Sequence, residues 1–159
     1  MSNKEKVIEF LNSNHGYITT AEFLTLGMSK PLIQKFLDEG LIERVSYGLY
    51  MDNKILKDEY FILQKKYPLA IFSYNTALHI LNLTNRTPMK IDITVPRDKK
   101  VRGNYNIHRV SEKFYDIGII ETLSPSGNPV KIYNAERCIC DMLRTEGEFD
   151  LELQNRVLS

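Results

Sequence analysis

The residues best suited to chemistry are three polar side chains on one face of a short predicted helix: Lys30, Gln34 and Lys35. An α-helix fits the major groove of B-form DNA, where lysine and glutamine side chains reach base edges or phosphates. Ser29, just before this helix, and the free amides of its first turn suit a phosphate. The alternative is a polar face that is only solvated, as in any small helical domain.

Three predicted helices within residues 1–54 would position this polar face. The first runs from Lys4 to Asn14, where apolar residues recur at helical spacing. Thr19 and Glu22 have the spacing of a capping box, so a second helix is expected to follow Thr19 and to end at Gly27. The third helix carries the polar face, and its opposite side has apolar residues that must face a core: Leu32, Ile33, Phe36 and Leu37.

A predicted β-hairpin follows the third helix. Residues 41–45 alternate as a strand, residues 46–48 turn the chain, and residues 49–51 return as the partner strand. This order of elements is that of a winged helix-turn-helix, in which the wing contacts phosphates or the minor groove. The predicted DNA-contacting residues are therefore Thr19, Ser29, Lys30, Gln34, Lys35, Arg44, Ser46 and Tyr47.

Composition indicates an ordinary globular chain. Its 159 residues are 43% hydrophobic and 26% charged, which excludes the disordered and fibrous classes. No apolar run approaches the roughly 18 residues of a membrane span, and the charged N-terminus lacks the apolar region of a signal peptide. Cys138 and Cys140 would point to different faces of a helix, so neither a disulfide nor a metal site is expected. The predicted location is the cytoplasm, with reduced thiols.

Charge is distributed unevenly along the chain. Residues 1–54 hold six Lys/Arg against seven Asp/Glu, residues 55–110 hold ten against four, and residues 111–159 hold five against nine. A DNA-binding surface is usually basic, and the N-terminal part is not. Three possibilities therefore stay open. The protein binds DNA as a dimer, or the basic middle segment adds contacts to DNA. Otherwise the chain is a protein-interaction module whose winged helix binds a partner protein instead of DNA.

Residues 58–159 form a second predicted domain, of mixed α/β type with a small antiparallel sheet, so the predicted fold class is α+β. Helices are expected near residues 60–66, 72–81 and 135–144. The expected strands are 90–95, 105–110, 117–123 and 130–133. The end of the chain, from Phe149 to Ser159, has the pattern of the start of another helix.

Several short motifs follow one another in a specific order. The first domain has Tyr17-Ile18-Thr19-Thr20-Ala21-Glu22, Leu26-Gly27-Met28-Ser29, and Gly40-Leu41-Ile42-Glu43-Arg44-Val45-Ser46-Tyr47-Gly48-Leu49-Tyr50. The second has Ser73-Tyr74-Asn75-Thr76-Ala77-Leu78, Asp92-Ile93-Thr94-Val95-Pro96, and Tyr133-Asn134-Ala135-Glu136-Arg137 leading into Cys140-Asp141-Met142-Leu143. This order, which covers nearly the whole chain, resembles AbiEi-type antitoxins of type IV (abortive-infection) toxin–antitoxin systems.

The resemblance implies a winged-helix repressor that binds inverted repeats in its own promoter. Symmetric half-sites require a dimer or cooperative monomers, so a monomer or weak homodimer that is cooperative on double-stranded DNA is expected. The resemblance also implies that residues 58–159 counteract a nucleotidyltransferase-like toxin. Similar antitoxins continue through several further helices, so the chain is expected to be either a short form or a truncated one.

The most charged loop of the second domain has two possible partners. Its cations could contact DNA phosphates or an acidic protein surface, and a solvated loop tip is an equal alternative. They are Arg97, Lys99, Lys100 and Arg102.

The alternative from another functional class is an enzyme, namely a metal-dependent nuclease. Asp92 on a predicted strand, with Lys90 beside it, suits such a core. Magnesium would need further carboxylates on the adjoining strand, which offers His108 and Arg109 instead. The chain also has no triad order, glycine-rich phosphate loop or zinc spacing. The sequence therefore predicts no enzyme, no catalytic residue, no metal and no cofactor.

Overall fold

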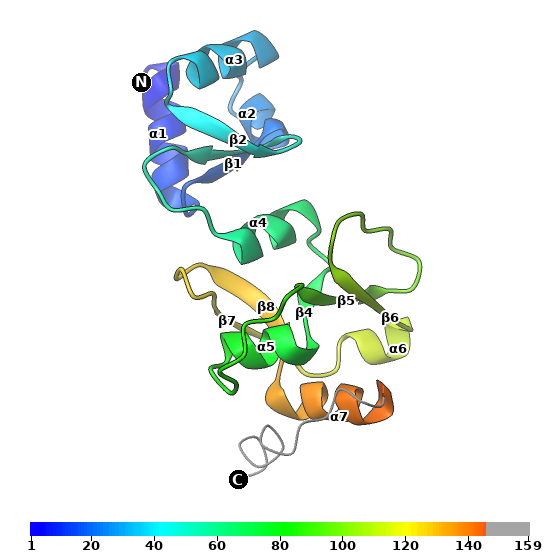
Figure 1. Cartoon of the computed structure of the whole chain (residues 1–159). Coiled ribbons are helices and arrows are strands. Elements are labelled where there is room, and N and C mark those ends of the chain that lie inside the picture. Colours follow the sequence, from blue (N-terminus) through cyan, green and yellow to red (C-terminus); the bar gives the residue numbers. More distant parts are fainter. Residues whose placement is uncertain (146–159) are drawn as a thin grey trace. The chain divides into compact units, whose positions relative to one another are not determined.

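The computed structural model describes residues 1–145 of the chain. Within them the fold is α+β, with seven helices, one three-stranded sheet and one five-stranded sheet (Figure 1). The chain divides after Asp58 into two compact units, called here the first and the second unit. No helix among these residues is both long and apolar enough to cross a membrane. The helix expected from Phe149 to Ser159 lies outside the described residues.

The first unit combines three helices with a three-stranded antiparallel sheet of order β1-β3-β2. The predicted helices and hairpin are present, but the sheet has a third strand, β1, that the sequence analysis missed. Three residues are too short for a periodic pattern, and β1 depends on pairing with β3 much later in the chain. The elements are α1 (Asn3–Ser13), β1 (Tyr17–Thr19), α2 (Thr20–Thr25), α3 (Lys30–Asp38), β2 (Ile42–Ser46) and β3 (Leu49–Asp52).

Local signals set the ends of the two helices that follow β1. The Thr19 hydroxyl accepts the Glu22 amide at 3.1 Å, and the Glu22 carboxylate accepts the Thr19 amide at 2.9 Å, which confirms the predicted capping box. Gly27, at φ +83°, ends α2 in the left-handed conformation. Pro31 lies in the first turn of α3, where its missing amide hydrogen breaks no helical bond.

The core of the first unit forms around Phe23. This side chain is fully buried between the ring of Phe36, 6.5 Å away and nearly parallel, and the edge-on ring of Tyr50 at 5.8 Å. Ile33 is buried beside them, so the apolar side of α3 faces the core as its spacing predicts. The polar side of the same helix is thereby turned outward.

The second unit has four helices and a five-stranded mixed sheet of order β6-β5-β4-β8-β7. Helix α5 packs against α7 and against β5, and α4 packs against β8. The elements are α4 (Glu59–Lys66), β4 (Ile71–Phe72), α5 (Tyr74–Ile80), β5 (Asp92–Pro96), β6 (Asn106–Val110), α6 (Glu112–Tyr115), β7 (Ile119–Leu123), β8 (Pro129–Tyr133) and α7 (Ala135–Thr145).

The prediction of a small antiparallel sheet was wrong in this unit. β5 pairs with β6 in parallel, as β4 does with β8, and only β4–β5 and β7–β8 are antiparallel. The loop from residue 97 to 105 explains the difference. Fully extended, nine residues span about 30 Å, which is enough to return the chain to the start of a five-residue strand. The sequence also does not predict strand β4 or the short helix α6, and it places Phe72 in a helix, whereas Phe72 lies in β4.

A buried charge network fixes α7 to α6 and to the turn between α6 and β7. Arg137 donates from Nε to both carboxylate oxygens of Asp141, at 3.1 and 3.0 Å. Its Nη1 donates to the carbonyls of Phe114 and Ile117, each at 2.6 Å, and its guanidinium lies 4.2 Å from the ring centre of Tyr133. Arg137 and Asp141 are thus a buried ion pair that stabilises the fold.

Candidate functional site

A groove on the first unit lies between α3 and the β2–β3 hairpin. Polar and cationic side chains from both elements line it, above an apolar floor. Among the lining residues of this groove there is no acidic side chain. The groove is lined by Thr20, Lys30, Ile33, Gln34, Leu37, Arg44, Tyr47, Gly48 and Tyr50.

Helix α3 contributes the exposed side chains of Lys30 and Gln34, one helical turn apart. The Gln34 amide donates to Asp38 Oδ1 at 2.9 Å on the helix surface. An exposed bond of this kind contributes little to stability, so the amide can exchange it for a bond to a ligand. This wall of the groove therefore offers one positive charge and one group able both to donate and to accept.

The hairpin contributes the opposite wall. Arg44 on β2 is exposed, and its guanidinium lies 5.7 Å from the ring centre of Tyr50, a cation–π distance that orients it. Tyr47 occupies the turn between the strands and is 98% exposed. A fully exposed aromatic side chain at a hairpin tip has no packing role in the unit, so it is available to a partner.

Four of the eight predicted contact residues lie outside the groove lining. The Thr19 hydroxyl is engaged in the capping box of α2. Ser29 stands at the N-cap of α3, but its side chain makes no capping hydrogen bond and is exposed. Lys35 is exposed on α3, and Ser46 is half-buried at the end of β2, after the shift of register that follows Arg44. The structure thus brings Lys30, Gln34, Arg44 and Tyr47 together.

Five residues of the groove lining are absent from the predicted contacts: Thr20, Ile33, Leu37, Gly48 and Tyr50. Tyr50 belongs to β3, and its ring lies under the guanidinium of Arg44. Thr20 is the first residue of α2. The Thr20 amide donates to the Gly48 carbonyl at 2.9 Å, which ties the start of α2 to the hairpin turn. For Tyr50, the available signal was the alternation of the second predicted strand. For Thr20 there was no local signal, because its contact with Gly48 joins residues far apart in sequence.

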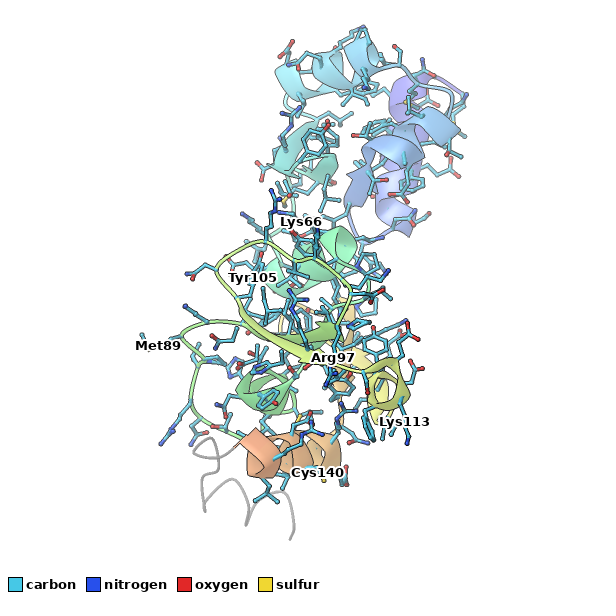
Figure 2. All side chains as sticks on the ribbon, turned by 90° about the vertical axis from the view of Figure 1, so that its right-hand side faces the viewer. Lys66, Met89, Arg97, Tyr105, Lys113 and Cys140 are labelled. Atoms are coloured by element: carbon cyan, nitrogen blue, oxygen red, sulfur yellow. The ribbon has the colours of Figure 1, made fainter. Side chains whose placement is uncertain are left out.

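The basic loop of the second unit is held by its backbone, while its cationic side chains are exposed. The Tyr67 hydroxyl donates to the Arg102 carbonyl at 3.1 Å and accepts the Arg102 amide at 3.3 Å. The Arg109 guanidinium donates to the Lys99 carbonyl. Figure 2 labels Arg97 and Tyr105, at the two ends of this loop. The cations of the predicted set (Arg97, Lys99, Lys100 and Arg102) are all exposed.

Asp92, the carboxylate of the nuclease hypothesis, is hydrogen-bonded to His108, one of the two residues that argued against a metal there. His108 Nε2 lies 3.1 Å from Asp92 Oδ1, on the neighbouring parallel strand. Asp92 is 6% exposed, and its backbone amide donates to the Thr76 hydroxyl at 2.8 Å. Residues 1–145 contain no cluster of three or more His, Cys, Asp or Glu that could hold a metal ion.

The two cysteines lie on different faces of α7, as predicted. Cys138 is fully buried, whereas Cys140 is exposed and projects from the helix (Figure 2). Burial, followed by the charge of Asp141, raises the pKa of the Cys138 thiol to about 12. Cys138 therefore remains a protonated core residue at neutral pH.

Alkaline pH is expected to weaken the folded state through Cys138. In the unfolded chain its thiol ionises near pH 9, whereas in the folded chain it stays protonated to about pH 12. The unfolded state therefore loses its proton first, and stability falls as the pH rises through this window. Between pH 8.5 and 10, the free energy of unfolding in urea should fall by about 1 kcal/mol more in the wild type than in Cys138→Ala.

Cys140→Ala is the matched control for this measurement. Its side chain is exposed, so the variant should keep the pH dependence of the wild type. Identical pH dependence in all three proteins would contradict the assignment to Cys138.

A scan against models of protein families gave no match to this chain, and a search of curated proteins gave no significant match.

Proposed function

We propose that this protein is a DNA-binding transcriptional repressor of the AbiEi antitoxin type, and that its first unit is a winged helix-turn-helix. The supporting element order is three helices with an antiparallel hairpin after the third helix. In this assignment α3 is the recognition helix, and the β2–β3 hairpin is the wing. The resemblance of the sequence motifs supports the same family.

The observation that carries the proposal is the groove of the first unit. Lys30 and Gln34 on α3 face the same groove as Arg44 and Tyr47 on the hairpin. Lysine and arginine neutralise phosphates, and glutamine reads adenine by paired hydrogen bonds in the major groove. In the proposed complex, α3 enters the major groove while Arg44 and Tyr47 contact the adjacent backbone. Two copies bind the two halves of an inverted repeat.

A gel-shift titration on the DNA upstream of the protein's own gene tests this proposal. The wild type should bind selectively, and its affinity should fall steeply between low and moderate salt. The triple variant Lys30→Ala/Gln34→Ala/Lys35→Ala should lose about 100-fold in affinity or more, because it removes base contacts worth roughly 1–3 kcal/mol each together with two charges.

The double variant Lys4→Ala/Lys6→Ala is the charge-matched control. It removes the same number of positive charges from α1, where both side chains are exposed and outside the groove. It should bind almost as tightly as the wild type. Equal losses in the two variants would mean that only net charge matters and would overturn the assignment of α3.

The second candidate function is a protein-interaction module that uses the same groove. The slightly negative net charge of residues 1–54 favours it, since this part of the chain has seven Asp/Glu and six Lys/Arg. A protein partner held by apolar contacts would show little salt dependence, unlike DNA. A folded wild type without selective DNA binding at low salt would favour this alternative.

The second unit, in the same proposal, counteracts a nucleotidyltransferase-like toxin. Its basic loop is a candidate surface for either DNA phosphate or an acidic face of that partner. A fourfold alanine variant of Arg97, Lys99, Lys100 and Arg102 separates these roles. Weaker gel shifts assign the loop to DNA, whereas lost growth rescue on co-expression with the toxin assigns it to the partner.

A further inference from the structure

A concavity of about 830 Å³ opens on the second unit over the starts of β5 and β6. This volume lies within the range of small-molecule sites, which is about 300–1,000 Å³. Two of its lining residues, Met89 and Tyr105, are labelled in Figure 2. The side chains used in the following argument are Asn75, Arg86, Lys90, Tyr105, Asn106 and His108.

A fixed imidazole borders the concavity. His108 Nε2 is bonded to Asp92, and the ring stacks on Tyr74 with 3.8 Å between ring centres and 18° between planes. The other oxygen of Asp92 accepts the Thr76 hydroxyl at 3.4 Å. Among the described residues nothing is bonded to Nδ1 of His108. The pair thus presents one oriented nitrogen, available to a ligand as donor or acceptor.

The backbone at Tyr74 adds a second sign of a built site. Its φ is +50°, a left-handed conformation that is uncommon for an aromatic residue. Such strain persists only where the surroundings impose it, and it concentrates at ligand sites. Here it places the Tyr74 ring against His108.

The charges around the concavity favour an anion. Arg86 and Lys90 line it, and the only acidic lining residue is Asp92, which is already bonded to His108 and Thr76. Phosphate groups pair strongly with arginine and lysine in partly enclosed sites.

The uncharged lining favours a ligand larger than a simple anion. Asn75 and Asn106 offer amide donors and acceptors, and Tyr105 offers a flat ring. That ring rests on the backbone of Gly103, where a Cβ would lie 2.4 Å from Tyr105 Cε2. Planar heterocycles with polar edges are recognised by this combination of amides and an aromatic side chain.

From these features we infer that the concavity is a binding site for a small phosphorylated ligand of nucleotide size. Lys90 holds the phosphate. Asn75, Asn106 and the ring of Tyr105 hold the heterocycle, and His108 Nδ1 bonds a polar group between them. The site uses no residue of the groove on the first unit, so it stands apart from the proposed repressor function.

Titration of the ¹⁵N-labelled full chain with the four common nucleoside 5′-monophosphates tests the inference. At least one should bind saturably and shift the amide signals of Asn75, Lys90, Asn106 and His108. The matching unphosphorylated nucleoside and inorganic phosphate alone should each bind at least about tenfold more weakly, since each lacks one set of contacts.

Lys90→Ala should weaken binding of that nucleotide about tenfold, because it removes one charge-assisted hydrogen bond. Lys131→Ala, which removes an exposed lysine of β8 outside the concavity, should bind like the wild type, as should Lys30→Ala/Gln34→Ala/Lys35→Ala. The spectrum of each free variant shows whether it is folded.

Three results would overturn the inference. They are the absence of saturable binding by any of the nucleotides, shifts that map elsewhere and are insensitive to Lys90→Ala, and inorganic phosphate that binds as tightly as the nucleotide.

Discussion

Replacing Asp141 with alanine is expected to lower the free energy of unfolding of the second unit by about 3–5 kcal/mol. The carboxylate is 2% exposed and accepts both hydrogen bonds from Nε of Arg137. Removing it leaves a buried guanidinium without its counter-charge, and the two carbonyl partners of Arg137 cannot neutralise it. Urea unfolding of the full chain, followed by circular dichroism, measures the loss.

Two further variants show whether charge is the cause. Asp141→Asn keeps an oxygen that can accept from Nε, so its loss should be smaller than that of Asp141→Ala. Glu136→Ala removes an exposed acid from the first turn of the same helix and should lower stability by less than about 1 kcal/mol. Equal losses for Asp141→Ala and Glu136→Ala would contradict the role of the buried pair.

Replacing Phe23 with alanine is expected to unfold most of the first unit. Removal of a buried phenylalanine costs about 3–5 kcal/mol, and a unit of this size has a total stability of only about 3–9 kcal/mol. The ring supports both Phe36 of α3 and Tyr50 under the groove, so selective DNA binding should disappear although no groove side chain has changed. Amide spectra of the full chain measure the effect: signals of residues 1–58 should lose their dispersion, while those of the second unit keep theirs.

Leu24→Ala is the matched control for Phe23→Ala. It truncates the next residue of α2, whose side chain is 51% exposed, and should leave both the spectrum and DNA binding close to those of the wild type. A Phe23→Ala protein as stable as Leu24→Ala would show that the core does not depend on this ring.

The parts of the first unit that depend on neighbouring residues could be predicted from the sequence. The capping box of Thr19 and Glu22, the stop at Gly27 and the two faces of α3 each involve residues within one or two helical turns. The polar face of α3 and the tip of the β2–β3 hairpin followed from these elements. For the same reason Lys30, Gln34, Arg44 and Tyr47 could be expected in one region before the groove was known.

The parts that depend on distant pairing could not be predicted. β1 and β4 are strands only because β3, β5 and β8 lie beside them, and two or three residues carry no period of their own. The parallel direction of β6 depends on the path of a loop, which local patterns do not specify. The concavity beside Asp92 and His108 follows from that direction, so the sequence indicated the neighbouring strands but not the site.

The pairing of β4 with β8 has a consequence for the order of folding during synthesis. Phe72 pairs with Ile132, so the middle of the five-stranded sheet cannot close until the ribosome has passed β8. Every strand pair of the first unit lies within residues 17–52, and contacts at short sequence separation form faster. N-terminal units also emerge and fold first. The nascent chain is therefore expected to complete the groove of its first unit before β8 of the second unit has been synthesised.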